Sequence, residues 1–458
     1  MTFDLEHFRL KSLDLGQLTG ASMALHAIPD AYFLKHTGVG CKHKTVTQFG
    51  THDWAKGVAA HEGWTEVGDA ALIRGSGRRV GPYARSAFQR HKPSILAVSS
   101  VTFLDLTGDD LPDVVAGLDA ELPCEVMLLK VPGFEGDLYS GYLTTMIEVC
   151  RRMDWSIAPD RAQEVALLGY LWDRYEGDHQ GNQLQLKALL QAVGLQLGPV
   201  LFSGTPYTAL REAPRSKTLL CLPYAEPKRK TLQRVCKRDL VSVDLPIGRR
   251  FTSQFLRVAA SAAGVAAATV EGLIARQEAA LGERLGTMVD HLRGQSVAVF
   301  ADLPLLAGTM ATLEELGVRV VVAGIRGRTL GKPGDLHAAL ARVGARVPEG
   351  CEVVYEPSLA RVRRLCADAI AAGTLDGVLG SATDLNALGT LPASTPLRRS
   401  AGTASRTTGP FKLEIGFPCR DHHCAYAMPF MGYMGVSIFV QRLLTAPRLW
   451  DTGAAVRV

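Results

Sequence analysis

Short apolar runs rich in β-branched residues alternate with longer amphipathic stretches along most of the chain. The runs have the length of buried parallel strands, and the stretches between them carry apolar positions at helical spacing. The pattern predicts strands at residues 94–99, 125–131, 164–169, 199–202, 218–222, 295–301, 318–323, 351–355 and 377–379. It predicts helices at residues 109–121, 139–152, 183–193, 252–292, 303–316, 359–371 and 434–444. Because strand, turn and helix repeat in this order, we expect parallel sheets with helices on both faces.

The strand–helix alternation restarts twice along the chain, which indicates more than one sheet. We predict an α/β fold of three doubly wound, Rossmann-like domains with parallel sheets. The expected domains are residues 15–160, 161–290 and 291–430, followed by a C-terminal helix and tail at 431–458. Binding sites in such folds lie at the carboxyl ends of the strands and between domains.

The composition narrows the class of protein and its partners. The 458 residues are 47% hydrophobic and 21% charged, which is typical of a globular protein and excludes a disordered or collagen-like chain. The net charge of +5 is spread along the sequence, so we expect neither nucleic acid nor a membrane as a partner. The Ala-rich run at 258–270 is shorter than the roughly 20 residues that a membrane span needs, and we interpret it as a buried helix.

The chain has nine cysteines, an odd number with irregular spacing. The N-terminal segment lacks the basic start and apolar run of a signal peptide,. We therefore expect a cytoplasmic protein whose thiols are mostly free. Apolar or helical surroundings predict core positions for Cys221, Cys236, Cys351 and Cys366.

Several familiar motifs are absent or incomplete. No stretch matches the phosphate-binding pattern GxxxxGK[ST], so we expect no nucleotide in this chain. The glycine-rich residues 75–81 resemble a dinucleotide-binding loop only loosely, and we interpret them as a surface loop. Cys419, His422, His423 and Cys424 could furnish zinc ligands, but structural zinc sites bring two donor pairs from separate places. Because the sequence offers no second pair, we assign no metal to this segment.

Five motifs carry the candidate chemistry, and they occur in a fixed order. They are HTGVGC at 36–41, the segment from KPSILAVSS to GDDL at 92–111, PGFEG at 132–136, IGFP at 415–418 and PFMGYMG at 429–435. Together they resemble the large-component subunits of nitrogenase and nitrogenase-like reductases, specifically the β-type subunit. The resemblance extends over nearly the whole chain and implies the same three-domain α/β fold.

The cysteine positions of that family distinguish its members. A nitrogenase β subunit offers three cysteines to a bridging iron–sulfur cluster, and the resemblance aligns those positions with Gly16, Cys41 and Thr102. Only one thiolate remains, because glycine has no donor and a threonine hydroxyl is a poor ligand for iron beside a thiolate. The resemblance thus implies that Cys41 binds a smaller iron–sulfur cluster. Gly38 and Gly40 would let the backbone fold closely around it.

The resemblance also implies partners. An α-type subunit would pair with this chain in an α2β2 heterotetramer, share the iron–sulfur cluster and hold the complex iron–sulfur cofactor. A transient ATP-dependent reductase, similar to the nitrogenase iron protein, would deliver electrons. This β-type chain would relay them and would be non-catalytic alone. The catalytic residues are unknown.

Three functions within the family remain open. We favour a reductase that cleaves carbon–sulfur bonds, of the methylthio-alkane reductase type. The alternatives are a subunit of the scaffold that assembles the nitrogenase iron–molybdenum cofactor, and a tetrapyrrole reductase of the chlorophyllide type. Scaffold members usually keep QPLGA where this chain has Gln17-Leu-Thr-Gly-Ala. A sugar-nucleotide transferase, outside the family, would explain neither the Gly-Cys41 element nor the C-terminal motifs.

Overall fold

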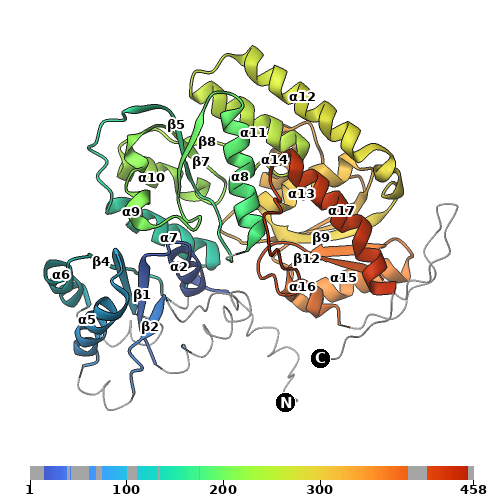
Figure 1. Ribbon diagram of the computed structural model, residues 1–458. Helices are drawn as coiled ribbons and strands as arrows, with labels where there is room; N and C mark the ends of the chain where they lie inside the picture. Colours follow the sequence, from blue (N-terminus) through green and yellow to red (C-terminus); the bar gives the residue numbers. More distant parts are fainter. Residues whose placement is uncertain are drawn as a thin grey trace, which may run out of the picture. The chain divides into compact units, whose positions relative to one another are not determined.

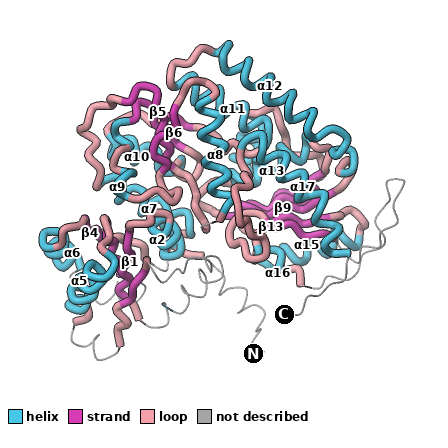
Figure 2. Tube along the Cα trace, in the orientation of Figure 1, coloured by secondary structure: helices cyan, strands magenta, loops and turns pink. Residues whose placement is uncertain are grey.

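The computed structural model describes residues 15–38, 42, 61–68, 75–100, 111–132, 135–174, 176–389 and 410–451. Within these ranges the chain forms three sheets, and every strand pair is parallel (Figures 1 and 2). The predicted α/β fold with parallel sheets is therefore confirmed. By its internal contacts the chain divides into two compact units, which are taken in turn below.

The first compact unit comprises residues 15–175 and 195–243 and holds two of the sheets. The first sheet has the strand order β2 (Glu62–Trp64), β1 (Ala31–His36), β3 (Ile95–Ser100), β4 (Glu125–Leu128). Its helices are α2 (Gln17–His26), α5 (Val80–His91), α6 (Leu111–Glu121) and α7 (Leu138–Arg151). The apolar sides of α5 and α6 form one buried cluster with Tyr32, Leu34 and Leu96 of the strands.

The second sheet is smaller and belongs to the same unit. Its order is β6 (Gln196–Val200), β5 (Arg161–Leu168), β7 (Ser216–Cys221), β8 (Val241–Ser242). The helices in this region are α9 (Tyr207–Leu210) and α10 (Arg229–Cys236). The basic stretch that includes α10 was not predicted to be helical, because its only buried residues are Leu232 and Cys236.

The second compact unit comprises residues 176–194 and 244–458. Its sheet has the order β11 (Glu352–Tyr355), β10 (Arg319–Arg326), β9 (Ser296–Asp302), β12 (Gly377–Gly380), β13 (Phe411–Glu414). The central strand β9 is buried along its whole length, as its continuous apolar run predicts,. The helices that accompany the sheet are α13 (Leu303–Glu315), α14 (Pro333–Arg342), α15 (Leu359–Ala371) and α16 (Ala382–Ala387). In Figure 1, α13 and α15 lie on opposite faces of this sheet.

Four further helices pack together in the second unit: α8 (Gly177–Gln191), α11 (Gly248–Ala262), α12 (Ala267–Leu285) and α17 (Gly432–Asp451). Three of them, α8, α11 and α12, come from the predicted middle domain 161–290 but group with the third sheet. All three contact α17, and α11 also contacts α13. The compact units therefore divide the chain differently from the predicted domains, whose boundaries stay a prediction.

The interpretation of residues 258–270 as one buried helix is wrong. Helix α11 ends at Ala262, and α12 begins at Ala267. Gly264 between them has a φ of 78°, the left-handed conformation that ends helices and that glycine adopts at low cost,. Most side chains of this run are exposed. Among the described residues, no helix has the length and apolar character needed to cross a membrane.

Candidate functional site

The carboxyl edge of the first sheet is where the predicted cluster loops leave the core. Strands β1 and β3 are parallel neighbours in which His36 is paired with Ser100, so both strands end at the same edge. In the sequence, Cys41 follows β1 and Thr102 follows β3 within a few residues. Cys41, Gly40 and Thr102 lie outside the described residues, whereas Gly38 is described and buried. The two loops named by the family motifs thus start from adjacent strands.

Gln17-Leu-Thr-Gly-Ala, which was compared above with the scaffold motif, lies close to the PGFEG motif through helices α2 and α7. Gly16 is the residue just before α2, and a Cβ on Gly20 would lie 1.8 Å from the carbonyl oxygen of Leu138. A Cβ on Gly141 would lie 1.9 Å from the carbonyl oxygen of Gln17. Gly136, with a φ of 67°, has so little space that a Cβ would lie 2.5 Å from Nε2 of Gln17. The start of α2 is therefore in direct contact with Gly136 and the start of α7.

His36 fixes the end of β1. Its Nδ1 lies 2.9 Å from Oγ1 of Thr65 and its Nε2 lies 2.9 Å from Oγ of Ser76, and all three side chains are buried. Both ring nitrogens are therefore engaged by protein hydroxyl groups. The interpretation of residues 75–81 as a surface loop is wrong at this point. Ser76 and Gly77 are buried, because Ser76 completes the contact with His36 just before α5 begins.

A buried ionic cluster lies beside this edge, and the sequence analysis missed it. Lys35 and Glu62 form an ion pair, and Nε2 of His26 lies 3.0 Å from Oε1 of Glu62. The Lys35 ammonium also lies 5.0 Å from the ring centre of Phe33 and 5.6 Å from that of Trp64. A lysine inside the apolar strand AYFLKH was the available signal, because a buried lysine requires a partner.

The electrostatics of this cluster follow from burial and pairing. Burial alone would raise the pKa of the Glu62 carboxyl, but Lys35 and His26 outweigh it and lower that pKa to about 2. Burial lowers the pKa of the Lys35 ammonium, while the charge of Glu62 acts in the opposite direction. The arrangement holds a carboxylate and its counter-charge together in the interior.

Comparisons with known proteins identify the family of the chain. The family model described as nitrogenase component 1 type oxidoreductase matches residues 16–447. The chain belongs to this family. Oxidoreductase subunits make up the family, and two relatives that match over most of this chain are beta chains, as the motifs predicted.

Two relatives and one solved structure describe the similarity. The nitrogenase molybdenum-iron protein beta chain of Clostridium pasteurianum is 22% identical over 93% of this chain and 90% of its own length. A subunit of the light-independent protochlorophyllide reductase of Heliobacterium modesticaldum is 27% identical over 56% of this chain, and the match spans 50% of that protein. A structure titled "Nitrogenase Cp1 at pH 6.5" superposes with a TM-score of 0.75 at 18% identity, covering 95% of this chain and 92% of the other. This structural match supports the fold.

Gly16 and His36 offer little to a metal cluster at this edge in this member of the nitrogenase component 1 family. Gly16 carries no donor, and both nitrogens of His36 are engaged. Among the described cysteines of the first sheet and its helices, Cys124 precedes β4 and Cys150 lies near the end of α7, both away from the carboxyl edge. Hydrogen bonding with Cys236, together with burial, raises the pKa of the Cys150 thiol. Cys41 follows β1 in the sequence and is therefore the cysteine that we expect at this edge.

Lys42, the residue after Cys41, is anchored beside β2. Its ammonium pairs with the carboxylate of Glu66 and lies 5.6 Å from the ring centre of Trp64. Cys221, Cys236 and Cys366 are buried, as predicted. Cys351, expected in the core, is partly exposed because it lies in the loop before the edge strand β11.

Proposed function

We propose that this chain is the β-type subunit of a nitrogenase-like reductase and that Cys41 ligates an iron–sulfur cluster shared with an α-type subunit in an α2β2 heterotetramer. The observation that carries the proposal is the common edge at which β1 and β3 end beside each other, since the cysteine-bearing loop of the family follows β1. Parallel α/β sheets bind their ligands at this edge. When bound, such a cluster supplies one-electron transfer.

The division of labour in the proposal follows from what the sequence contains. The chain has no phosphate-binding loop of the P-loop type, so ATP hydrolysis is assigned to a separate iron–sulfur reductase that docks transiently. The complex iron–sulfur cofactor and the substrate are assigned to the α-type subunit. This chain contributes one thiolate, the rigid backbone frame made by Gly20 and Gly141, and the buried charges of Lys35 and Glu62.

For the substrate we propose a methylthio-alkane, whose carbon–sulfur bond would be reduced. Support comes from departures from the other members: Leu18 and Thr19 replace the Pro-Leu of the scaffold motif, and Met434 stands in the closing Gly-Tyr-Met-Gly. A tetrapyrrole reductase is the second candidate. It is favoured by the 27% identity to a protochlorophyllide reductase subunit over 56% of this chain.

The ligand assignment is tested on the chain produced anaerobically together with its α-type partner. Wild-type complex, Cys41→Ala and the control Cys124→Ala are compared for iron content and for the electron paramagnetic resonance signal of the reduced cluster. We expect Cys41→Ala to lose the signal of the shared cluster while its thermal midpoint stays unchanged, and Cys124→Ala to keep both. A Cys41→Ala complex with unchanged iron and an unchanged signal would falsify the assignment.

The substrate is tested with the same complex, the ATP-dependent reductase, ATP and an electron donor. Ethyl methyl sulfide and protochlorophyllide are supplied in separate reactions. Two electrons and two protons convert the sulfide to methanethiol and ethane, and methanethiol is measured. Methanethiol formation supports the proposal, whereas reduction of protochlorophyllide alone supports the second candidate. If neither is reduced by a complex that holds its full iron content, both substrate assignments are wrong.

A further inference from the structure

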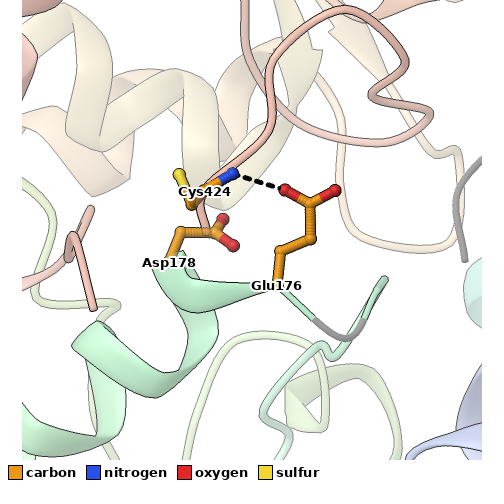
Figure 3. A group of neighbouring side chains, drawn as sticks. All are labelled: Glu176, Asp178 and Cys424. Carbon is orange, nitrogen blue, oxygen red and sulfur yellow. Dashed lines mark hydrogen bonds between the residues drawn. The ribbon is translucent and has the colours of Figure 1, made fainter. Parts of the chain in front are cut away.

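The segment at 419–424 lies against the beginning of α8 in the second compact unit. Figure 3 shows Cys424 above the first turn of α8, which carries Asp178 and is preceded by Glu176. A carboxylate oxygen of Glu176, a carboxylate oxygen of Asp178 and Sγ of Cys424 all lie within 4.8 Å of one another. These donors come from two parts of the chain that are far apart in sequence.

An imidazole lies next to the thiol, outside this group of three donors. Nε2 of His422 lies 3.4 Å from Sγ of Cys424. In a tetrahedral zinc site with Zn–S of about 2.3 Å and Zn–N of about 2.0 Å, the two ligand atoms lie about 3.5 Å apart. The thiol and the imidazole therefore already have the separation that a common metal ion requires. The ligand atoms of Glu176, Asp178 and Cys424 would have to move only slightly closer together to share one ion.

The backbone holds these donors in place. The N–H of Gly177 donates to the carbonyl oxygen of Cys424 at 2.8 Å, and a Cβ on Gly177 would lie 2.1 Å from the carbonyl oxygen of Tyr426. A Cβ on Gly181 would lie 2.5 Å from the backbone nitrogen of Pro429. Farther along α8, Oδ1 of Asn182 accepts hydrogen bonds from the backbone of Phe430 and Met431. Rigid contacts around the ligand-bearing residues orient the ligands before a metal binds.

The two cysteines of the segment have different surroundings. Sγ of Cys419 donates to Oε2 of Glu414 at 3.0 Å, and the same carboxylate accepts the backbone N–H groups of Arg420, Asp421 and His422. Cys419 thus belongs to the turn that shapes the loop. Cys424 is the thiol that faces the carboxylates.

Glu176 both orients the segment and adds charge. Its Oε2 accepts the N–H of Cys424 at 2.7 Å, and its Oε1 lies 2.5 Å from Nδ1 of His423. A carboxylate oxygen has two lone pairs, so it can accept a hydrogen bond and bind a metal ion as well. The cluster combines a thiolate, an imidazole and two carboxylates, a donor set in which zinc, a borderline-soft ion, is well accommodated.

We propose that Cys424, His422, Asp178 and Glu176 bind one zinc ion that fastens the C-terminal segment to α8. The second donor pair that the sequence analysis sought among cysteines and histidines is supplied by two carboxylates. Four protein ligands leave no open coordination position, so the site is structural. The proposal is independent of Cys41 and of the reaction of the complex.

The test uses the full chain, purified anaerobically with reductant, stripped with a chelator, reloaded with Zn²⁺ and desalted. Zinc is then measured by mass spectrometry, and Co²⁺ serves as an optical probe whose thiolate charge-transfer band reports sulfur ligation. We expect about one zinc ion per chain. Asp178→Asn, which keeps the size of the side chain, should weaken zinc binding by roughly tenfold or more. Cys424→Ser should also abolish the cobalt–thiolate band.

Two control variants separate this site from other thiols. Cys419→Ser changes the neighbouring cysteine and should retain zinc, and Cys41→Ala should retain zinc even where it loses iron. Wild-type protein that binds no zinc overturns the proposal. So does equal zinc binding by wild type, Cys424→Ser and Asp178→Asn. If Cys424→Ser fails to fold, folded Asp178→Asn with unchanged affinity is sufficient to reject the site.

Discussion

The ammonium group of Lys35 donates to the carboxylate of Glu62 inside the first sheet, where both side chains are fully shielded from solvent. Removal of one partner leaves the other charge buried without its counter-charge. We therefore expect Glu62→Gln to lower the free energy of unfolding by about 3–5 kcal/mol, measured by urea denaturation. The double variant Lys35→Met, Glu62→Leu should recover much of the loss. The control Glu121→Gln breaks the exposed pair with Arg85 and should leave the urea midpoint unchanged,.

The same pair predicts an acid-dependent stability. Burial would raise the pKa of Glu62, but Lys35 and His26 lower it from 4.5 to about 2 in the folded chain. The unfolded chain therefore takes up this proton first as the pH falls. The contribution of the carboxylate is complete above about pH 4.5 and is lost towards pH 2, and it amounts to about 3 kcal/mol. Between these pH values the free energy of unfolding should fall more steeply with decreasing pH for wild type than for Glu62→Gln. Equal slopes for the two proteins would contradict this prediction.

The close approach of α2 and α7 predicts opposite effects for two glycines. Gly141→Ala places a methyl group against the backbone of Gln17, so the helices must separate at a cost of about 1–3 kcal/mol,. Gly117→Ala in the exposed side of α6 meets no atom within 4 Å and should stabilise the chain by up to about 1 kcal/mol,. Thermal midpoints would check both signs. A harmless Gly141→Ala would show that the helices can move apart freely.

His36 predicts a positioning effect on the loop that follows it. His36→Leu leaves the buried hydroxyl groups of Thr65 and Ser76 without the ring, at a cost of about 1–3 kcal/mol,. Because β1 leads directly to residues 38–41, the variant should also retain less iron than wild type. Ser76→Ala removes one of the two bonds and should have a smaller effect on both measurements. If His36→Leu has a lower thermal midpoint but retains as much iron as wild type, the role of His36 is structural only.

The lack of a P-loop predicts that the purified chain does not hydrolyse ATP,. Phosphate release should stay at the level of the buffer for the chain alone and should appear on addition of the ATP-dependent reductase. The prediction would be wrong if ATP hydrolysis co-purified with the chain and was abolished by a substitution in the chain.

Much of the fold could be predicted from the sequence because buried strands have a strong local signature. The run at β9 is apolar throughout and lies where expected, and the same holds for the parallel sheets as a class. Helix α10 was missed because it has only 8 residues, of which Leu232 and Cys236 are buried. The grouping of α8 with α17 was also missed, since it depends on contacts between segments about 250 residues apart in sequence,.

The candidate sites show the same distinction between local and distant information. The motif residues of β1 and α2 could be recognised individually, but the contact of Gln17 with Gly136 depends on the close packing of α2 and α7. The buried pairing of Lys35 with Glu62 joins β1 to β2, and Glu62 carries no sequence signal of its own. The approach of Cys424 to Asp178 is likewise a tertiary contact between residues that no local pattern connects.

The parallel pairing of β1 and β3 has a consequence for how such proteins diversify. Positions 41 and 102, which align with cysteines of the family, follow the strands in the sequence, whereas the residues that hold the sheet together lie within the strands. We therefore expect that a thiol can be gained or lost at position 41 or 102 without a change in the residues of the strands themselves. Evolution could thus change the number of iron ligands one substitution at a time, and a protein engineer could reverse the process by restoring cysteine at Gly16 and Thr102.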